Sequence, residues 1–128
     1  MGEFYLDKRI YYHDTDTGGV VYYGSYLNHL EEGRTEFLRS IGIDVAEYTA
    51  KGILFPVVHL EIDYKSPARY GDSIRIFTKV EKAGNASASF AQEIKRGDTI
   101  LLKAKVTWAC VDSNMKARRI PEEMRAKL

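Results

Sequence analysis

Apolar and polar residues alternate along much of the chain after residue 53, which is the pattern of strands that bury one face. The clearest example runs from Ile100 to Cys110, where apolar residues occupy every second position and polar residues stand between most of them. The other predicted strands cover 53–66, 73–82 and 86–95, with turns at 67–72 and 96–98. Pro56, near the start of the first of them, indicates an edge strand or a bulge.

Helical spacing precedes these strands. Apolar residues three, four and seven positions apart predict one long helix that is capped by Ser25 and stops at Gly42. They are Leu27, Leu30, Phe37, Leu38 and Ile41. A shorter helix is expected over 44–51, and Pro121 is expected to open a terminal one. Residues 4–12, rich in aromatic and β-branched side chains, predict a first strand, which a polar loop joins to the long helix.

The order of strand, long helix and four further strands predicts a single α+β domain over residues 1–128. In it, a five-stranded antiparallel sheet curls around the helix. The short connections among the last four strands favour antiparallel neighbours that follow one another in the sheet. The edges of such a sheet can pair with another copy of the chain, so we expect a homo-oligomer.

Charge and composition narrow the class of protein. The net charge is +1 over 128 residues, and no basic stripe appears before the C-terminal end, so no nucleic-acid partner is expected. No apolar run approaches the ~18 residues that a membrane span needs. The single cysteine, Cys110, cannot form an internal disulfide, which fits a reducing compartment. With no signal-peptide pattern at the N-terminus, we expect a cytoplasmic protein.

The loop before the long helix carries the candidate chemistry. Asp14 and Asp16 lie two positions apart, and Gly18 and Gly19 follow. Glycines let backbone N–H groups approach a ligand closely, and a helix N-terminus presents unpaired N–H groups and a positive dipole end. Such donors can hold a developing oxyanion while a neighbouring carboxylate attacks a carbonyl or activates water.

A thioester suits so sparse a site, because the conjugate acid of its thiolate leaving group has a pKa near ~8.5 and little general-acid help is needed. The same residues also fit a plain turn in which the aspartates accept backbone N–H groups. No metal site is expected, since His13, His29 and His59 lack a zinc-ligand spacing and no EF-hand pattern is present. Cys110 lies on a predicted buried face and is expected to be inert.

The segment from Tyr11 to Tyr26 closely resembles the active-site signature of the 4-hydroxybenzoyl-CoA thioesterase family, and is most similar to its branch associated with the Tol-Pal gene cluster. The signature includes the run Asp14-Thr15-Asp16-Thr17-Gly18-Gly19-Val20-Val21-Tyr22. The resemblance continues in order along nearly the whole chain, through Glu31, 34–36, 38–39, 62–69 and 110–112.

The resemblance implies a hotdog fold and an acyl-CoA thioesterase, which hydrolyses an acyl-CoA thioester to the free acid and coenzyme A. Coenzyme A is then part of the substrate, and no cofactor is expected. Subunits of the family pair through their sheets, and dimers associate into tetramers. Asp16 matches the catalytic carboxylate, as nucleophile or as general base. The N–H of Tyr23 matches the donor to the thioester carbonyl, Gly19 matches the glycine that permits close approach, and Asp14 is expected to shape the loop.

Two departures from the family pattern affect the site. Tyr23 stands where many members of the Tol-Pal branch have a histidine, and His13 replaces an acidic residue common there, so catalysis is expected to depend on Asp16 and the helix N-terminus. The basic cluster that meets coenzyme A phosphates in the hydroxybenzoyl branch is reduced to Lys82. The candidate substrate contacts are His13, Val21, Tyr22 and Tyr26 around the loop, His59 toward the pocket of a partner subunit, and Arg69 and Lys82 toward phosphates.

An alternative from a different class is a non-hydrolytic module that binds acyl-CoA or an acyl carrier protein. It predicts tight binding without turnover of any acyl thioester. Asp16 favours the enzyme, because a pure binder needs no carboxylate beside the carbonyl. A scaffold of the cell-envelope machinery is a third reading, which rests on the branch resemblance alone.

Overall fold

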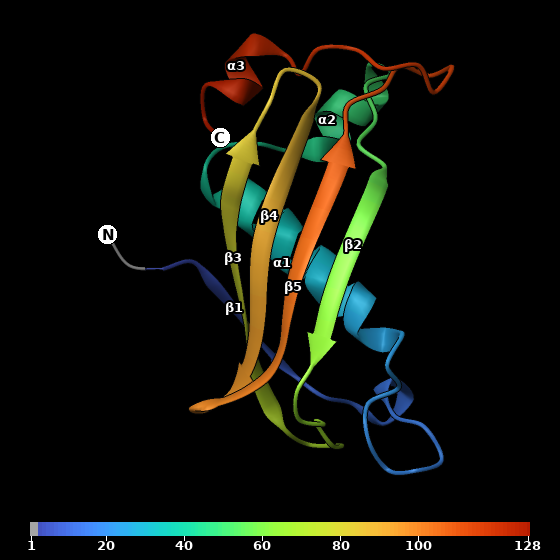
Figure 1. Cartoon of the computed structure of the whole chain (residues 1–128), viewed down its shortest axis with the longest axis vertical. Coiled ribbons are helices and arrows are strands. Elements are labelled where there is room, and N and C mark those ends of the chain that lie inside the picture. The colour runs from blue at the N-terminus through green and yellow to red at the C-terminus, as the bar shows by residue number, and fades with distance from the viewer. Residues whose placement is uncertain (1–2) are drawn as a thin grey trace.

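The computed structural model describes residues 3–128, whose five strands form one antiparallel sheet that curves around the long helix (Figure 1). The elements in chain order are β1 (Tyr5–Arg9), the 3-10 helix η1 (Tyr12–Asp14), α1 (Ser25–Ser40), α2 (Val45–Ala50), β2 (Val57–Tyr64), β3 (Ser73–Ala83), β4 (Ser87–Arg96), β5 (Thr99–Ala109) and α3 (Glu122–Arg125). This is the predicted α+β arrangement of a curled sheet and one central helix.

The strand order is β1-β3-β4-β5-β2, and it corrects one prediction. β3, β4 and β5 follow one another through short turns, as expected. β2 and β3 do not pair, because β2 lies beyond β5 at the far edge of the sheet. The 65–72 connection therefore crosses the end of the sheet instead of forming a hairpin. There it bonds with residues on both sides of the polar loop, through Ile10 N to Asp72 O (2.8 Å) and Val21 N to Ala68 O (2.8 Å).

The prediction for Pro56 is confirmed. It directly precedes β2, which is an edge strand, and the pairing of β2 with β5 shifts register between Val57 and His59. An edge position explains why a residue without an N–H is tolerated. The apolar side chains that the edge leaves exposed are those of Val57, Val58, Leu60 and Tyr64.

The face of α1 that packs on the sheet differs from the predicted stripe. Tyr26, His29, Leu30, Gly33 and Leu38 are buried, whereas Leu27 is 42% exposed. The buried face includes two residues with polar groups and a glycine, which a search for apolar spacing passes over. Ser25 is the first helical residue, not the cap, since Gly24 precedes it with helical dihedral angles.

The first strand is shorter than predicted. β1 ends at Arg9, and Tyr11 and Tyr12 belong to the turn around η1, with rings 54% and 78% exposed. Their aromatic character is typical of strands, but here they lie on the surface of the loop. None of the helices within residues 3–128 is both long and apolar enough to cross a membrane.

Candidate active site

The polar loop folds as a small hairpin between η1 and α1. Tyr22 N donates to Asp14 O (2.9 Å), Asp16 N donates to Val20 O (2.9 Å), and Gly19 N donates back to Asp16 O (3.1 Å). Gly19 has a φ of +79°, a conformation that glycine adopts without the strain a Cβ imposes. The tip of the hairpin is thus a tight turn directly after Asp16.

One stem of this hairpin is anchored in the core. Val21 N donates to Ala68 O (2.8 Å), and Ala68 N donates to the hydroxyl of Tyr26 (3.1 Å). All three residues are buried and belong to the core cluster below the loop. Burial raises the pKa of the Tyr26 hydroxyl, so this group stays neutral and keeps its hydrogen bonds. Val21 and Tyr26, expected near the substrate, therefore lie under the loop and support it.

Asp16 is exposed at the surface of the hairpin. Its Oδ1 accepts a hydrogen bond from Gly18 N (2.8 Å), which fixes the orientation of the carboxylate. A Cβ at Gly18 would lie 3.2 Å from the same oxygen, so a larger residue at this position would crowd the carboxylate. Asp16 is therefore oriented by the backbone and open to a ligand.

Asp14 lies in the opposite environment. Only 7% of this residue is exposed, and its Oδ2 accepts the N–H of Tyr11 (2.9 Å) while its backbone oxygen accepts that of Tyr22. These bonds are typical of an aspartate that shapes a loop. Asp14 therefore supports the loop through local hydrogen bonds, whereas Asp16 is accessible to a ligand.

The start of α1 lies directly after the hairpin. Ser25 N donates to Tyr22 O (2.8 Å), whereas no acceptor within residues 3–128 pairs with the N–H of Tyr23. The backbone oxygen of Tyr23 accepts the hydroxyl of Tyr64 on β2 (3.0 Å), which fixes this peptide against the sheet. An unpaired N–H at the positive end of a helix is suited to hold a carbonyl oxygen as negative charge develops on it.

Exposed tyrosine rings surround this N-terminus. The rings of Tyr22 and Tyr23 lie 4.8 Å apart between centroids, and that of Tyr23 lies 6.5 Å from Tyr64. Their exposures are 47%, 65% and 48% respectively. The side-chain hydrogen bond with Tyr23 raises the pKa of the Tyr22 hydroxyl, so this hydroxyl stays neutral at physiological pH. The rings offer an apolar surface beside the unpaired N–H.

The remaining predicted contacts are spread over the subunit. Arg69 bridges with Val20 and lies beside the loop, and the exposed His13 has Nε2 3.7 Å from Asp14 Oδ1. His59 lies on the edge strand β2, where it pairs with Glu61 (3.2 Å). Lys82 lies near the end of β3 remote from the loop, next to the turn into β4 (Figure 1). A single subunit therefore gathers the loop residues but not His59 and Lys82.

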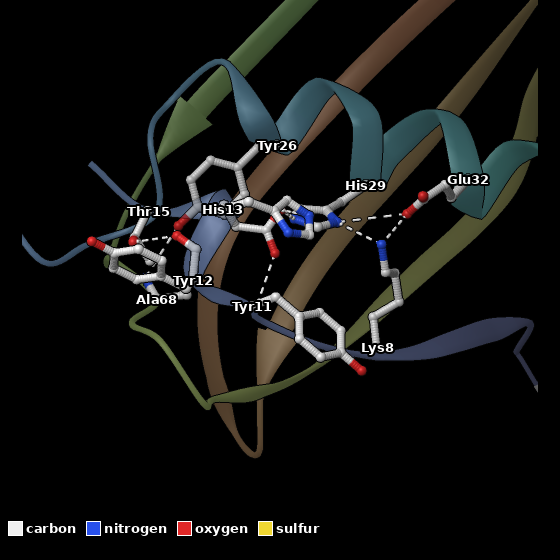
Figure 2. A network of polar contacts seen from close by, with 10 residues as sticks. Lys8, Tyr11, Tyr12, His13, Thr15, Tyr26, His29, Glu32 and Ala68 are labelled. Atoms are coloured by element: carbon white, nitrogen blue, oxygen red, sulfur yellow. Dashed lines mark hydrogen bonds and ion pairs between the residues drawn. The ribbon is translucent and has the colours of Figure 1, made fainter.

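A polar cluster below the loop was missed by reasoning from the sequence. It consists of Lys8, Asp14, His29 and Glu32 and is called the His29 cluster below (Figure 2). His29 was weighed only as a metal ligand, and within residues 3–128 no group of three or more His, Cys, Asp or Glu side chains is placed to hold a metal. The available signal was a polar side chain three positions after Tyr26 and one before Leu30, on the packed face of a helix.

Comparison with known proteins places the chain among thioesterases. Residues 11–128 match the thioesterase-like superfamily. The chain is 38% identical over 125 residues to the acyl-CoA thioesterase YbgC of Haemophilus influenzae, a match that covers 96% of this chain and 92% of that protein.

Solved structures are similar over the same length. A "Probable Thioesterase" from Bartonella henselae has a TM-score of 0.85 and 34% identity, over 93% of this chain and 98% of that one. A variant of 4-hydroxybenzoyl-CoA thioesterase in complex with 4-hydroxybenzoyl-CoA has a TM-score of 0.88 over 98% of this chain and 97% of that one. At 18% identity, the second likeness is one of fold alone.

Proposed function

Because the chain belongs to the thioesterase-like superfamily, we propose that it hydrolyses acyl-CoA thioesters to a free acid and coenzyme A. Membership confirms the predicted family resemblance, the hotdog fold and the class of thioester hydrolase. The observation that carries the proposed site is the exposed, backbone-oriented carboxylate of Asp16 on the hairpin that leads into α1, where Tyr23 has an unpaired N–H.

In the proposed mechanism the N–H of Tyr23 holds the thioester carbonyl oxygen and stabilises the negative charge that develops on it. Asp16 then acts in one of two ways. As nucleophile, its carboxylate attacks the carbonyl carbon and expels the thiolate of coenzyme A, and water cleaves the resulting anhydride. As general base, it takes a proton from a water molecule that attacks the same carbon. Both routes release a thiolate, which needs no dedicated proton donor.

Substrate contacts follow from the same placement. The exposed rings of Tyr22 and Tyr23 flank the acyl group, and Arg69 beside the loop is a contact for the phosphates of coenzyme A. His13 is exposed beside Asp14 at the start of the loop, where a substrate can reach it. Val21 and Tyr26 support the pocket from below. An acyl chain on an acyl carrier protein offers the same thioester and is a second possible donor.

A second copy of the chain completes the proposed site. His59 and Lys82 lie away from the loop of their own subunit, so they can reach a substrate only in another subunit's site. The exposed apolar side chains of Val57, Val58 and Leu60 give β2 a surface on which a homodimer can form, and two dimers can form a tetramer.

The test is release of free thiol from short, long and aromatic acyl-CoAs. Asp16→Asn should lower kcat by about 10²–10⁴-fold, because the amide can neither attack the carbonyl nor take a proton from water. Asp98→Asn, which makes the same change in the exposed turn between β4 and β5, should retain full activity. Full activity of Asp16→Asn would contradict the assigned role. Tight binding of acyl-CoA with no turnover would favour the binding module instead.

A further inference from the structure

The His29 cluster lies between α1 and β1, beside the turn that begins the proposed catalytic loop (Figure 2). Lys8 on β1 places Nζ 3.1 Å from Nδ1 of His29 and bonds with the carboxylate of Glu32. On the other side of the ring, Nε2 lies 3.4 Å from Oδ1 of Asp14. His29 is 2% exposed, and its Nε2 is the only buried side-chain nitrogen or oxygen within residues 3–128 that lacks a hydrogen-bond partner.

These contacts fix the tautomer of His29. Lys8 Nζ lies nearer to Nδ1 than Glu32 Oε1 does (3.1 Å against 3.6 Å), and an ammonium can only donate, so Nδ1 accepts and carries no proton. The ring proton therefore resides on Nε2, the nitrogen that faces Asp14. A buried N–H costs free energy unless it is paired, and the Asp14 carboxylate is the acceptor beside it. The 3.4 Å between Nε2 and Oδ1 places the two groups at the outer limit of a hydrogen bond, which a small movement of either side chain would shorten.

A hydrogen bond from His29 to Asp14 would also restrain the loop, because Asp14 is bonded to residues on both sides of it. Its second carboxylate oxygen holds Tyr11 N (2.9 Å) at the start of η1, and its backbone oxygen holds Tyr22 N (2.9 Å) across the hairpin that carries Asp16. The opposite stem is held by Tyr26 through Ala68. Tyr26 and His29 are three residues apart on the buried face of α1, so one helix face supports both sides of the loop.

We propose that His29 is a positioning residue: in its neutral form, with the proton on Nε2, it holds the Asp14 carboxylate and thereby keeps Asp16 in line with the N-terminus of α1. This inference rests on the proposed function, since it assigns Asp16 the reacting carboxylate. Lys8 sets the tautomer, and Glu32 holds Lys8 in place.

Protonation of His29 breaks this arrangement. The titratable and charged groups that face the ring are Lys8 from β1, Asp14 from the loop, and Tyr26 and Glu32 from α1. His13 is exposed and approaches the same Asp14 Oδ1 with its Nε2, at 3.7 Å. A proton on Nδ1 would oppose the donors of the Lys8 ammonium, so Lys8 would have to move. Burial, and then Lys8, lower the pKa of His29, against the smaller opposing effects of Asp14 and Glu32. The neutral, positioning form is thus the one that the fold accommodates.

Two substitutions distinguish the role of Nε2 from that of Nδ1. His29→Gln places an amide N–H₂ near the position of Nε2 and keeps a donor toward Asp14. His29→Asn places an amide oxygen near Nδ1, which keeps the acceptor for Lys8 but loses that donor. At pH 8, we expect His29→Gln to retain kcat within about 3-fold, and His29→Asn to lose about 10²-fold in kcat with little change in KM. Equal losses in both variants, or none in either, would overturn the proposal.

Nuclear magnetic resonance of the unmodified protein gives a readout independent of activity. The ¹⁵N shifts of His29 should report the Nε2–H tautomer at neutral pH, and exchange of the Gly18 and Tyr22 amides should accelerate in His29→Asn but not in His29→Gln. The Nδ1–H tautomer, or unchanged exchange in His29→Asn, would overturn the positioning role even if a variant folds poorly. If the wild type hydrolyses no acyl-CoA, the proposed function fails, while these measurements still decide the role of His29.

Discussion

Asp14 and Asp16 are two positions apart, yet their carboxylates do opposite work. The carboxylate of Asp14 is buried against His29 and holds the N–H of Tyr11, so it is committed to the structure of the loop. That of Asp16 is exposed and accepts one backbone N–H, so it can meet a substrate. The difference arises because Asp14 ends η1 and packs toward α1, whereas Asp16 lies at the turn of the hairpin.

The burial of His29 predicts how stability depends on pH. Its pKa is lowered in the folded state by burial and by Lys8, while in the unfolded chain it is near 6.5. Below pH 6.5 the unfolded chain therefore binds a proton that the folded protein does not, and stability falls as pH falls. Urea unfolding should show the free energy of unfolding falling between pH 6.5 and 5.5, by at most about 1 kcal/mol from this group.

The control for this effect is His29→Gln, which cannot take up the proton. Its unfolding free energy should fall less steeply than that of the wild type over the same interval. Parallel curves for the two proteins would show that His29 does not cause the pH dependence.

At the residue scale, the sequence predicts the loop that carries Asp16 better than it predicts the buried side chains that support this loop. The spacing of Asp14, Asp16 and the two glycines, together with the family resemblance, pointed to the loop and assigned Asp14 a structural role, which its contacts fit. The cluster of Lys8 with His29 could not be predicted, because the two residues are 21 positions apart and no periodic pattern joins them. Such a contact exists only once β1 packs beside α1.

At the scale of elements, the close contact between Gly33 and the sheet sets the position of α1. A Cβ at Gly33 would lie 2.5 Å from Cγ2 of Ile76 and 3.2 Å from Nε2 of Gln92. That amide also donates to the backbone oxygen of Leu30 (2.9 Å), so it joins helix and sheet at the same level. The absent side chain of Gly33 thus sets the distance between α1 and β3, and with it the position of the helix N-terminus.

Gly33→Ala should therefore destabilise the protein by about 1–3 kcal/mol through overpacking. This is opposite in sign to the gain of about 1 kcal/mol that alanine gives over glycine in an exposed helix. Asn28→Ala, at an exposed position of the same helix, should be neutral or slightly stabilising. Urea unfolding of the two variants measures the sign of each change in the free energy of unfolding. A stabilised Gly33→Ala would mean that the helix can move away from the sheet without a cost in free energy.

The elements themselves were largely predictable, and their order in the sheet was not. Alternation identified β5 with few exceptions, because its inward side chains pack on the core while its lysines face solvent. Alternation marks which residues of a strand are buried but not which strand lies beside it, so the place of β2 beyond β5 had no signal apart from Pro56. Leu27 was misplaced because the packed face of α1 also contains Tyr26, His29 and Gly33.

On the scale of the whole molecule, the subunit leaves apolar side chains exposed along one side. Val57, Val58 and Leu60 of β2 lie at the sheet edge, and Tyr64 extends this surface to the ring of Tyr23 at the proposed site. Leu27 on α1 is exposed as well. A surface of this kind on an edge strand is typical of an interface, and it ends at Tyr23, so we expect assembly to affect the proposed site.

Val58→Lys should therefore convert the proposed oligomer to monomers. We expect kcat/KM to fall as the oligomer is lost. Val58 is 62% exposed, so the lysine disturbs the folded subunit little, but a charge at a sheet edge opposes pairing with a second copy. Thr99→Lys adds the same charge at the exposed first residue of β5, a strand inside the sheet, and should leave the assembly intact. Sedimentation measures the mass of each variant. A dimeric Val58→Lys would place the interface elsewhere, and a fully active monomer would show that one subunit holds the complete site.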